Sequence, residues 1–223
     1  MVYDLANVIY TPESLKAAQE YLLSRGINMS AMRFPPALTG SSPEPFKYLS
    51  KFLPPHLFTE TLFFPITDIE NPANLIGFDA RYLGTDKTRL RYRKFKDNEN
   101  EFLLYYTKPL NEIDADTPLI VTEGVVDAET ISPLGFPVIS PLTAMHHFKF
   151  CCFLKAVSNN VYFAYDNDSS GQNAVKNIIK EIQICPEMEK TFKFLNFQGK
   201  DLNDSLKNKG KDYLYSILRS QIF

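Results

Sequence analysis

The sequence has little cysteine and no closely spaced cysteine pair. Its three cysteines, Cys151, Cys152 and Cys185, form no C-x-x-C motif and have no metal-ligand spacing with the histidines. This pattern excludes a zinc ribbon and is typical of reduced, buried thiols in a cytoplasmic protein. The adjacent residues His146 and His147 would face different directions on a helix, which disfavours a shared metal site.

Long apolar runs and a strong net charge are also missing. The apolar runs fall far short of the ~20 residues that a membrane helix needs. Residues 1–10 show no basic region followed by an apolar core and a cleavage site, so we expect no secretion signal and no membrane partner. The net charge of −2 gives no global attraction to nucleic acid, so any such preference must be local.

At 223 residues the chain is long enough for one large domain or two small ones. The composition turns polar and acidic around residues 110–117, which we interpret as a junction. We therefore predict two subdomains, residues 1–112 and residues 113–223. The predicted fold class is α/β, with a mixed α+β first subdomain and a second subdomain built on a central, mainly parallel sheet.

The first subdomain is predicted to begin with a helix and to continue with strands. Thr11 is a suitable N-cap with Pro12 at the first helical position, and Arg25-Gly26 closes the helix. Residues 62–66 and 75–81 flank a turn rich in Asp, Asn and Pro, which predicts a β-hairpin. A third strand is expected over residues 87–95.

That third strand is unusually basic. Residues 87–96 include six basic residues and no acidic one, and Arg89, Arg91 and Arg93 alternate with apolar residues. On a strand these three guanidinium groups would share one face. Two interpretations stay open, a solvated edge strand whose charge prevents aggregation and a face that binds nucleic-acid phosphates. A divalent-metal site in the same chain would favour the second.

Carboxylates follow three apolar runs of the second subdomain. The runs are residues 119–121, 161–165 and 191–197, and the carboxylates that follow them are Glu123, Asp166, Asp168, Asp201 and Asp204. Short apolar runs of this kind are typical of strands buried on both faces of a parallel sheet. Helix-compatible segments follow the first two runs, at residues 127–130 and 172–184, which predicts a repeated β-turn-α pattern.

In a parallel sheet the carboxyl ends of the strands meet at one edge, where ligands bind. Neighbouring carboxylates repel one another, and a hard divalent cation such as Mg²⁺ keeps them ionised. The stretch from Asp166 to Gly171 is also typical of a solvated turn, because Asp, Asn, Ser and Gly all favour turns. Three acidic strand ends in one subdomain favour the metal site.

The order of these motifs resembles a known domain. Glu123-Gly124, then Asp166-x-Asp168-x-x-Gly171, then Gly199-Lys200-Asp201 are similar to the Toprim domain of DnaG-type primases, topoisomerases and some nucleases. The N-terminal half resembles the first part of the DnaG-type primase catalytic core, so the resemblance covers roughly residues 12–210. The matching N-terminal motifs are residues 21–26, Arg33-Phe34, residues 64–66, residues 76–78 and Arg81.

The resemblance implies a DNA-templated RNA primase that makes short primers on single-stranded DNA by Mg²⁺-dependent nucleotidyl transfer, with Mn²⁺ as a substitute and no zinc. The implied catalytic residues are Glu123, Asp166 and Asp168. The implied metal-binding residues are Glu123, Asp127, Asp166, Asp168, Asp201 and Asp204. Together with the basic stretch, the resemblance assigns nucleic-acid or nucleotide binding to Arg33, Arg81, Lys87, Arg89, Arg91, Arg93 and Lys200.

Two departures from the family pattern keep other functions open. Val125-Val126 replaces the usual Tyr-Met, and Asn203 stands where an aspartate is common, so one metal site would be weaker or would use Asp204. The alternatives are a metal-dependent Toprim nuclease and a non-catalytic, primase-like DNA-binding accessory protein. The primase-like N-terminal half argues against the nuclease, and the retained carboxylates argue against the accessory protein.

The expected partners follow from the resemblance. They are a single-stranded DNA template, nucleoside triphosphates, and a replicative helicase or a separate template-recognition subunit. A separate helicase or template-recognition subunit is expected because the sequence has neither the length for a helicase domain nor the cysteines of the family's zinc-binding domain. The expected location is the cytoplasm of a bacterial cell or of a phage-infected host.

Overall fold

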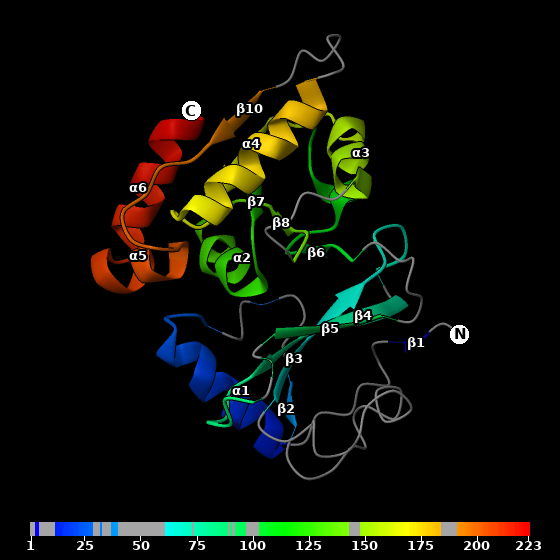
Figure 1. Cartoon of the computed structure of the whole chain (residues 1–223), viewed down its shortest axis with the longest axis vertical. Coiled ribbons are helices and arrows are strands. Elements are labelled where there is room, and N and C mark those ends of the chain that lie inside the picture. The colour runs from blue at the N-terminus through cyan, green and yellow to red at the C-terminus, as the bar shows by residue number, and fades with distance from the viewer. Residues whose placement is uncertain are drawn as a thin grey trace. The chain divides into compact units, whose positions relative to one another are not determined.

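The structure is a computed structural model of the chain. It describes residues 3–4, 12–28, 32, 37–39, 61–72, 74–88, 90, 92–96, 103–142, 148–183 and 191–223. The chain divides into two compact units, Met1–Leu103 and Leu104–Phe223 (Figure 1). The observed boundary follows Leu103 and is therefore earlier than the boundary predicted at residue 112. The reason is that strand β6 (Tyr105–Tyr106) already pairs within the sheet of the second unit.

An antiparallel sheet forms the centre of the N-terminal unit. Its strands are β1 (Tyr3–Asp4), β2 (Ala37–Thr39), β3 (Thr61–Thr67), β4 (Asn74–Tyr82) and β5 (Tyr92–Lys96). They run in the order β1-β4-β3-β2, and β5 also pairs with β4. The predicted hairpin is confirmed as β3 and β4. Its turn is closed by the Asp68 carboxylate, which accepts from the backbone N–H groups of Glu70 at 2.8 Å and Asn71 at 2.9 Å.

Helix α1 (Pro12–Ser24) confirms the first predicted helix. Ala18 and Leu22 lie four residues apart and are both buried, which gives the helix one apolar face. The helix ends where Gly26 takes a left-handed φ of 76°. The predicted N-cap, Thr11, lies outside the described residues.

The predicted third strand begins later than expected. Lys87 and Thr88 lie in a turn, because the Asp86 carboxylate accepts from both the backbone N–H of Thr88 at 2.9 Å and its hydroxyl at 2.7 Å. The strand itself, β5, starts at Tyr92. The strand prediction over residues 87–95 is therefore wrong at its N-terminal end.

The C-terminal unit is built on a mainly parallel sheet, as predicted. Its other strands are β7 (Leu119–Thr122), β8 (Val138–Ser140), β9 (Val161–Ala164) and β10 (Phe192–Phe194). The order is β10-β9-β7-β8-β6, and only the pairing of β6 with β8 is antiparallel. Strands β7, β8 and β9 are buried along their whole length, which explains their nearly continuous apolar sequence.

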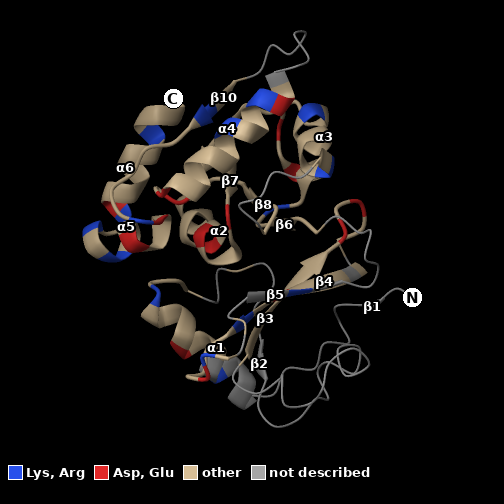
Figure 2. Ribbon diagram, in the orientation of Figure 1, with Lys and Arg blue, Asp and Glu red and all other residues tan. Residues whose placement is uncertain are grey.

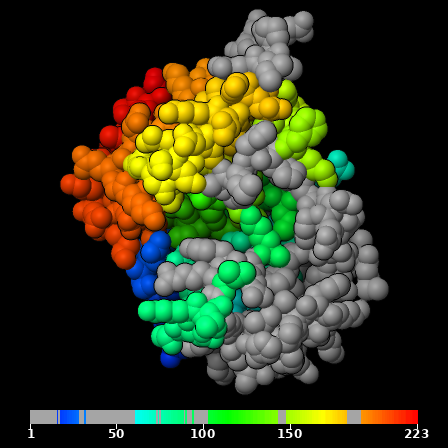
Figure 3. Space-filling view, in the orientation of Figure 1, coloured from blue at the N-terminus to red at the C-terminus, as the bar shows by residue number. Residues whose placement is uncertain are grey.

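Helices cover both faces of this sheet. The helices are α2 (Val125–Ile131), α3 (Phe148–Ala156), α4 (Ser169–Gln183), α5 (Leu202–Lys209) and α6 (Lys211–Ile222), with short 3-10 turns at Leu110–Glu112 and Ser132–Leu134. Helix α3 packs beside α4, whereas α5 packs against α2 and α6. Right-handed crossovers place α2 on one face and α3 and α4 on the other. Figure 3 shows α4 and α5 side by side on the surface of this unit.

Among the described helices, none is both long and apolar enough to cross a membrane.

The cysteine prediction holds in part. Cys151 is buried, and burial raises the pKa of its thiol to about 11, whereas Cys152 is exposed. Residues Cys185, His146 and His147 lie outside the described part of the chain.

Candidate active site

Two acidic strand ends lie next to each other in the C-terminal sheet. Strands β7 and β9 are parallel neighbours, with Thr122 opposite Ala164. Glu123 follows directly after β7, and Asp166 follows β9 after one further residue, Tyr165. The prediction that both carboxylates reach the same edge of the sheet is therefore confirmed.

The loop after β9 is tied to the loop after β10 by Asn167. Its backbone N–H donates to the carbonyl of Lys200 at 2.8 Å. Its side-chain amide donates to the carbonyls of Phe197 at 2.8 Å and Gly199 at 2.9 Å. These three bonds hold Asp166 and Asp168 against the segment that carries Asp201. Sequence reasoning missed Asn167, because its partners lie about thirty residues away.

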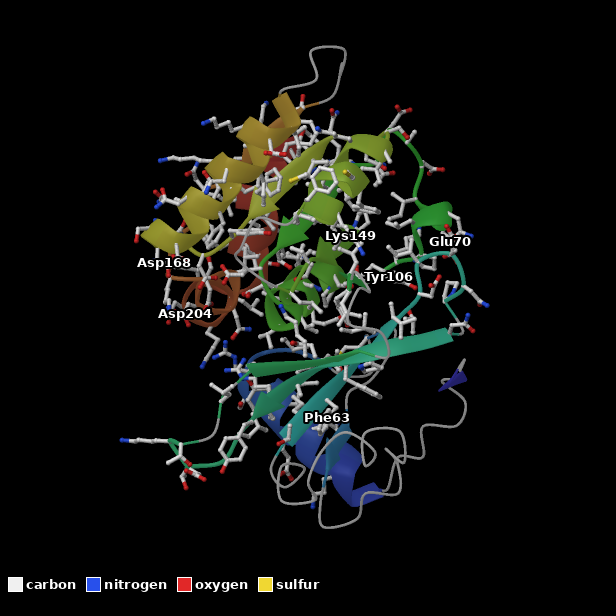
Figure 4. All side chains as sticks on the ribbon, turned by 45° about the vertical axis from the view of Figure 1, so that its right-hand side comes forward. Phe63, Glu70, Tyr106, Lys149, Asp168 and Asp204 are labelled. Carbon is white, nitrogen blue, oxygen red and sulfur yellow. The ribbon has the colours of Figure 1, made fainter. Side chains whose placement is uncertain are left out.

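Four aspartates interact at this edge. Burial raises the pKa of Asp166, and the nearby negative charges of Asp201, Asp168 and Asp204 raise it further, against the opposing effect of the Lys200 cation. Figure 4 shows Asp168 at the start of α4 and Asp204 on α5, at the same edge of the unit. Figure 2 shows acidic residues at the starts of α2, α4 and α5. The edge therefore carries an excess of negative charge.

This donor set fits a hydrated divalent cation. Carboxylate oxygens are the ligands that Mg²⁺ prefers, and Mg²⁺ usually keeps several waters while one or two carboxylates bind it. Within the described ranges, no three His, Cys, Asp or Glu side chains lie close enough to hold an ion by themselves. The arrangement is therefore that of an open, acidic edge and not of a closed protein cage.

Two of the four aspartates also cap helices. The Oδ1 atom of Asp168 accepts from the backbone N–H of Gly171 at 2.9 Å, at the start of α4. The Oδ1 atom of Asp201 accepts from the backbone N–H of Asp204 at 2.7 Å, at the start of α5. Each cap satisfies an N–H group that the helix cannot bond internally and fixes the direction of its carboxylate.

The cap predicts different stabilities for two substitutions of Asp168. Asp168→Ala removes the capping oxygen and should lower the free energy of unfolding by about 1 kcal/mol. Asp168→Asn keeps a capping oxygen and removes one negative charge from the cluster, so its stability should equal or exceed that of the wild type. Urea unfolding of the three proteins measures both effects. An equal loss in the two variants would show that the cap does not stabilise α4.

Gly171 allows the chain to pass close to Asp166. A Cβ atom at this position would lie 2.4 Å from the backbone oxygen of Asp166 and 3.1 Å from its nitrogen. Such distances are far below normal van der Waals contact, so only glycine fits here without movement of the backbone. The glycine therefore sets how closely α4 approaches the loop that carries Asp166.

The carboxylates before and within α2 lie at the neighbouring strand end. Glu123 is half-buried, and its negative charge is the second cause, after burial, that raises the pKa of the buried Tyr165 hydroxyl. Asp127 lies in the first turn of α2 and is half-buried. Both residues are thus placed at the edge where the sequence predicted them.

Asn203 does not point toward the aspartates. It is fully buried in the first turn of α5, and its side-chain amide donates to the hydroxyl oxygen of Thr130 at 3.0 Å. The next residue, Asp204, is half-buried, and its charge acts on Asp166. Asp204 therefore lies near the aspartates, whereas the Asn203 side chain bonds to Thr130.

A buried carboxyl group that sequence reasoning missed lies behind the site. Glu129 of α2 is 1% exposed, and the Tyr105 hydroxyl donates to its Oε1 atom at 2.5 Å. Burial raises the pKa of Glu129 to about 7, although the bond from Tyr105 opposes this shift. No local pattern points to this residue, because its partner lies 24 residues earlier in the chain.

Glu129 predicts a pH dependence of stability. In the unfolded chain it ionises near its ordinary pKa of 4.5, whereas the folded protein keeps the proton up to about pH 7. The folded state thus binds more protons between these values, and its stability falls as the pH rises from 4.5 to about 7. The free energy of unfolding decreases by ~3 kcal/mol in total, at 1.36 kcal/mol for each unit by which the pKa is raised.

Glu129→Gln isolates this effect, because glutamine keeps an acceptor for Tyr105 and cannot ionise. We expect nearly equal stability of the two proteins at about pH 5 and a more stable variant at about pH 8. Burial also raises the pKa of Asp79 in β4 to about 7. Its ionisation changes the stability of both proteins equally, so it cancels when the two are compared. A variant that is less stable at both pH values would contradict the prediction.

Most of the predicted basic residues belong to the N-terminal unit. Arg33, Arg89 and Arg91 lie outside the described residues, and Arg93 is described only through the backbone of β5. The Arg81 guanidinium of β4 lies 5.3 Å from the centre of the Tyr21 ring, which holds it by a cation–π interaction. Lys87 is exposed in its turn. Lys200, in the C-terminal unit, is exposed beside Asp166.

Comparison with known proteins defines the class of the C-terminal unit first. Residues 120–206 match the family described as Toprim-like. This range contains β7, β9 and the acidic residues from Glu123 to Asp204. The matched range lies within the C-terminal unit, and its parallel sheet and acidic edge agree with this similarity.

The similarity to primases extends over nearly the whole chain. A curated DNA primase of Aquifex aeolicus (strain VF5) is 28% identical over 229 residues, which cover 92% of this chain and 45% of that protein. The chain thus spans about half the length of this curated relative. The crystal structure of the Aquifex aeolicus primase, with its zinc-binding and RNA polymerase domains, has a TM-score of 0.74 at 25% identity and covers 93% of this chain and 57% of that chain.

Two further solved structures share the fold. A DnaG primase catalytic domain bound to single-stranded DNA has a TM-score of 0.73 at 21% identity and covers 96% of this chain and 76% of that chain. The primase fragment of the bacteriophage T7 primase-helicase protein has a TM-score of 0.62 at 16% identity and covers 90% of this chain and 73% of that chain. The chain has the fold of the DnaG-type primase catalytic core, and residues 120–206 of its C-terminal unit are similar to the Toprim-like family.

Proposed function

We propose that the chain is the catalytic core of a DNA primase that joins ribonucleotides into short primers on single-stranded DNA. The observation that carries the proposal is the group of four aspartates around Asp166 at the strand ends of the Toprim-like unit, in a chain with the fold of primase catalytic cores. Nucleotide joining needs such a site, because negative charge develops on the transferred phosphate.

The acidic edge is the proposed Mg²⁺ site, and Mn²⁺ can replace Mg²⁺ there. The residues from which its one or two protein ligands would come, with water completing the coordination, are Glu123, Asp127, Asp166, Asp168, Asp201 and Asp204. When bound, a divalent ion lowers the pKa of the attacking 3′-hydroxyl and neutralises charge on the triphosphate. The caps on Asp168 and Asp201 orient these carboxylates before any ligand arrives. Glu123 either completes the ligand set or accepts the proton of the attacking hydroxyl.

The basic residues would bind the substrates through phosphates. In the N-terminal unit these residues are Arg33, Arg81, Lys87, Arg89, Arg91 and Arg93, which would hold the template. Contacts to phosphates give affinity with little sequence information. Lys200 lies beside Asp166 and would contact the triphosphate of the incoming nucleotide.

The proposed partners are the single-stranded template, nucleoside triphosphates and a replicative helicase or a template-recognition subunit. The similarity to the primase fragment of a primase-helicase protein supports the helicase. We assign no zinc to this chain, because its cysteines form no ligand pair. The proposed location is the cytoplasm of a bacterial or phage-infected cell, because a primase acts where its DNA template is replicated.

One assay separates this function from its alternatives. The protein is incubated with Mg²⁺, single-stranded DNA labelled at its 5′ end and ribonucleotides that carry a second label. New short oligonucleotides that depend on the template are the expected products. Shortening of the template without synthesis would identify a Toprim nuclease instead. DNA binding with neither reaction, even after addition of a cognate helicase, would identify an accessory protein.

A further inference from the structure

Asn203 and Thr130 form a buried bond between two helices of the site. Asn203 is 0% exposed and Thr130 is 3% exposed, and the Asn203 amide donates to the Thr130 hydroxyl oxygen at 3.0 Å. The Thr130 hydroxyl in turn donates to the backbone carbonyl of Val126 at 2.8 Å, one turn earlier in α2. The two partners are 73 residues apart in the sequence, so the bond joins separate elements.

The bonds of Thr130 fit an amide at position 203 better than a carboxylate. In the observed arrangement the Thr130 hydroxyl donates to the Val126 carbonyl and accepts from the Asn203 amide. An asparagine supplies the needed N–H donor, whereas an ionised aspartate has only acceptors. An ionised aspartate at this position could accept from Thr130 only if the hydroxyl gave up its bond to the Val126 carbonyl, and burial would also disfavour the negative charge. The departure from the acidic family pattern is thus accounted for by the packing of α5 on α2.

The bond joins the two halves of the acidic edge. Thr130 lies one turn after Asp127 on α2, the helix that follows Glu123. Asn203 lies between Asp201 and Asp204 at the start of α5. The bond therefore fixes the carboxylates of one strand end relative to those of another. Asn167 makes the equivalent link between the loops after β9 and β10.

We propose that Asn203 is a positioning residue, which through Thr130 sets the spacing of the acidic edge and thereby its affinity for a divalent cation. The bond to Thr130 also removes position 203 from the ligand set and leaves that role to Asp204. The inference rests on the proposed metal-dependent function, and it assigns to this chain a ligand arrangement that differs by one residue from the family pattern.

The test measures Mn²⁺ binding and stability in the full chain. Free Mn²⁺ is followed by electron paramagnetic resonance for the wild type and for Asn203→Ala, Thr130→Val, Thr130→Ser and the Ala/Val double variant. We expect each of the first two variants to bind Mn²⁺ about 10- to 100-fold more weakly, the loss typical of residues that orient metal ligands. Thr130→Ser keeps the hydroxyl and should bind as the wild type does. The double variant should bind Mn²⁺ no more weakly than either single variant, because the two single substitutions remove the same bond.

Asn203→Asp provides the sharpest comparison. We expect it to lose stability and to gain no Mn²⁺ affinity, because its carboxylate would be buried against Thr130. Retained stability with tighter Mn²⁺ binding would show that position 203 is a ligand, which would overturn the proposal. Unchanged Mn²⁺ affinity in folded Asn203→Ala and Thr130→Val would also overturn it, since the bond would then be structural only. Primer synthesis is not a readout here, so a wild type that binds Mn²⁺ and makes no primers contradicts the proposed function alone.

Discussion

Replacing Asp166 by Asn is expected to lower primer synthesis by about 10²- to 10³-fold, the loss that follows when one group is removed from a preorganised electrostatic site. Asp166 is the residue on which the charges of Asp168, Asp201 and Asp204 all act, so its carboxylate lies at the centre of the cluster. Its substitution removes a half-buried charge that its neighbours repel, so we expect the folded protein to be at least as stable as the wild type.

Primer yield at saturating Mg²⁺ and urea unfolding together check this prediction. Loss of activity with retained stability is the expected result. A variant that unfolds easily would mean that Asp166 is needed for the fold, and a fully active variant would mean that the chemistry uses another site. Glu129→Gln is a useful comparison for the unfolding measurement, since it also removes a buried carboxyl but lies outside the proposed ligand set.

Replacing Gly171 by Ala is expected to destabilise the protein by about 1–3 kcal/mol or more, as overpacking of a close contact does. The added Cβ would lie 2.4 Å from the backbone oxygen of Asp166, so either α4 or the loop that carries Asp166 must move. We therefore expect weaker Mn²⁺ binding together with the loss of stability, because the displaced loop carries the central carboxylate.

Gly124→Ala is the matched control for this substitution. Gly124 also belongs to the site, but the nearest atom to an added Cβ is the Asp127 Oδ2 at 4.0 Å, an ordinary contact. The control should therefore change stability much less than Gly171→Ala. Equal effects of the two substitutions would show that the close approach at Asp166 does not limit the packing of α4.

The acidic strand ends could be predicted from the sequence because each depends on local signals. A short apolar run followed by carboxylates is enough to predict a buried strand whose end is acidic, and parallel pairing then brings neighbouring ends together. The order of β9 and β7 in the sheet fulfils that expectation at Asp166 and Glu123. Hairpin β3–β4 was predictable for a similar reason, since its turn is closed within residues 68–74.

Features that depend on tertiary packing could not be predicted in this way. Helix α5 contains few apolar residues, so its sequence gives little helical periodicity, and its start is fixed by the Asp201 cap. That start turns Asn203 inward and leaves Asp204 at the edge. The burial of Glu129 likewise depends on Tyr105, which comes from the two-residue edge strand β6. Strands of this length carry no periodic signal.

The most direct test of the metal site is to map where a bound ion lies. Fe²⁺ replaces Mg²⁺, and ascorbate with peroxide then produces hydroxyl radicals that cut the backbone beside the ion. We expect cuts next to Glu123, Asp166 and Asp201, which excess Mg²⁺ suppresses and which Asp166→Asn abolishes. Cuts at other positions, or cuts at the three strand ends that persist unchanged in Asp166→Asn, would contradict it.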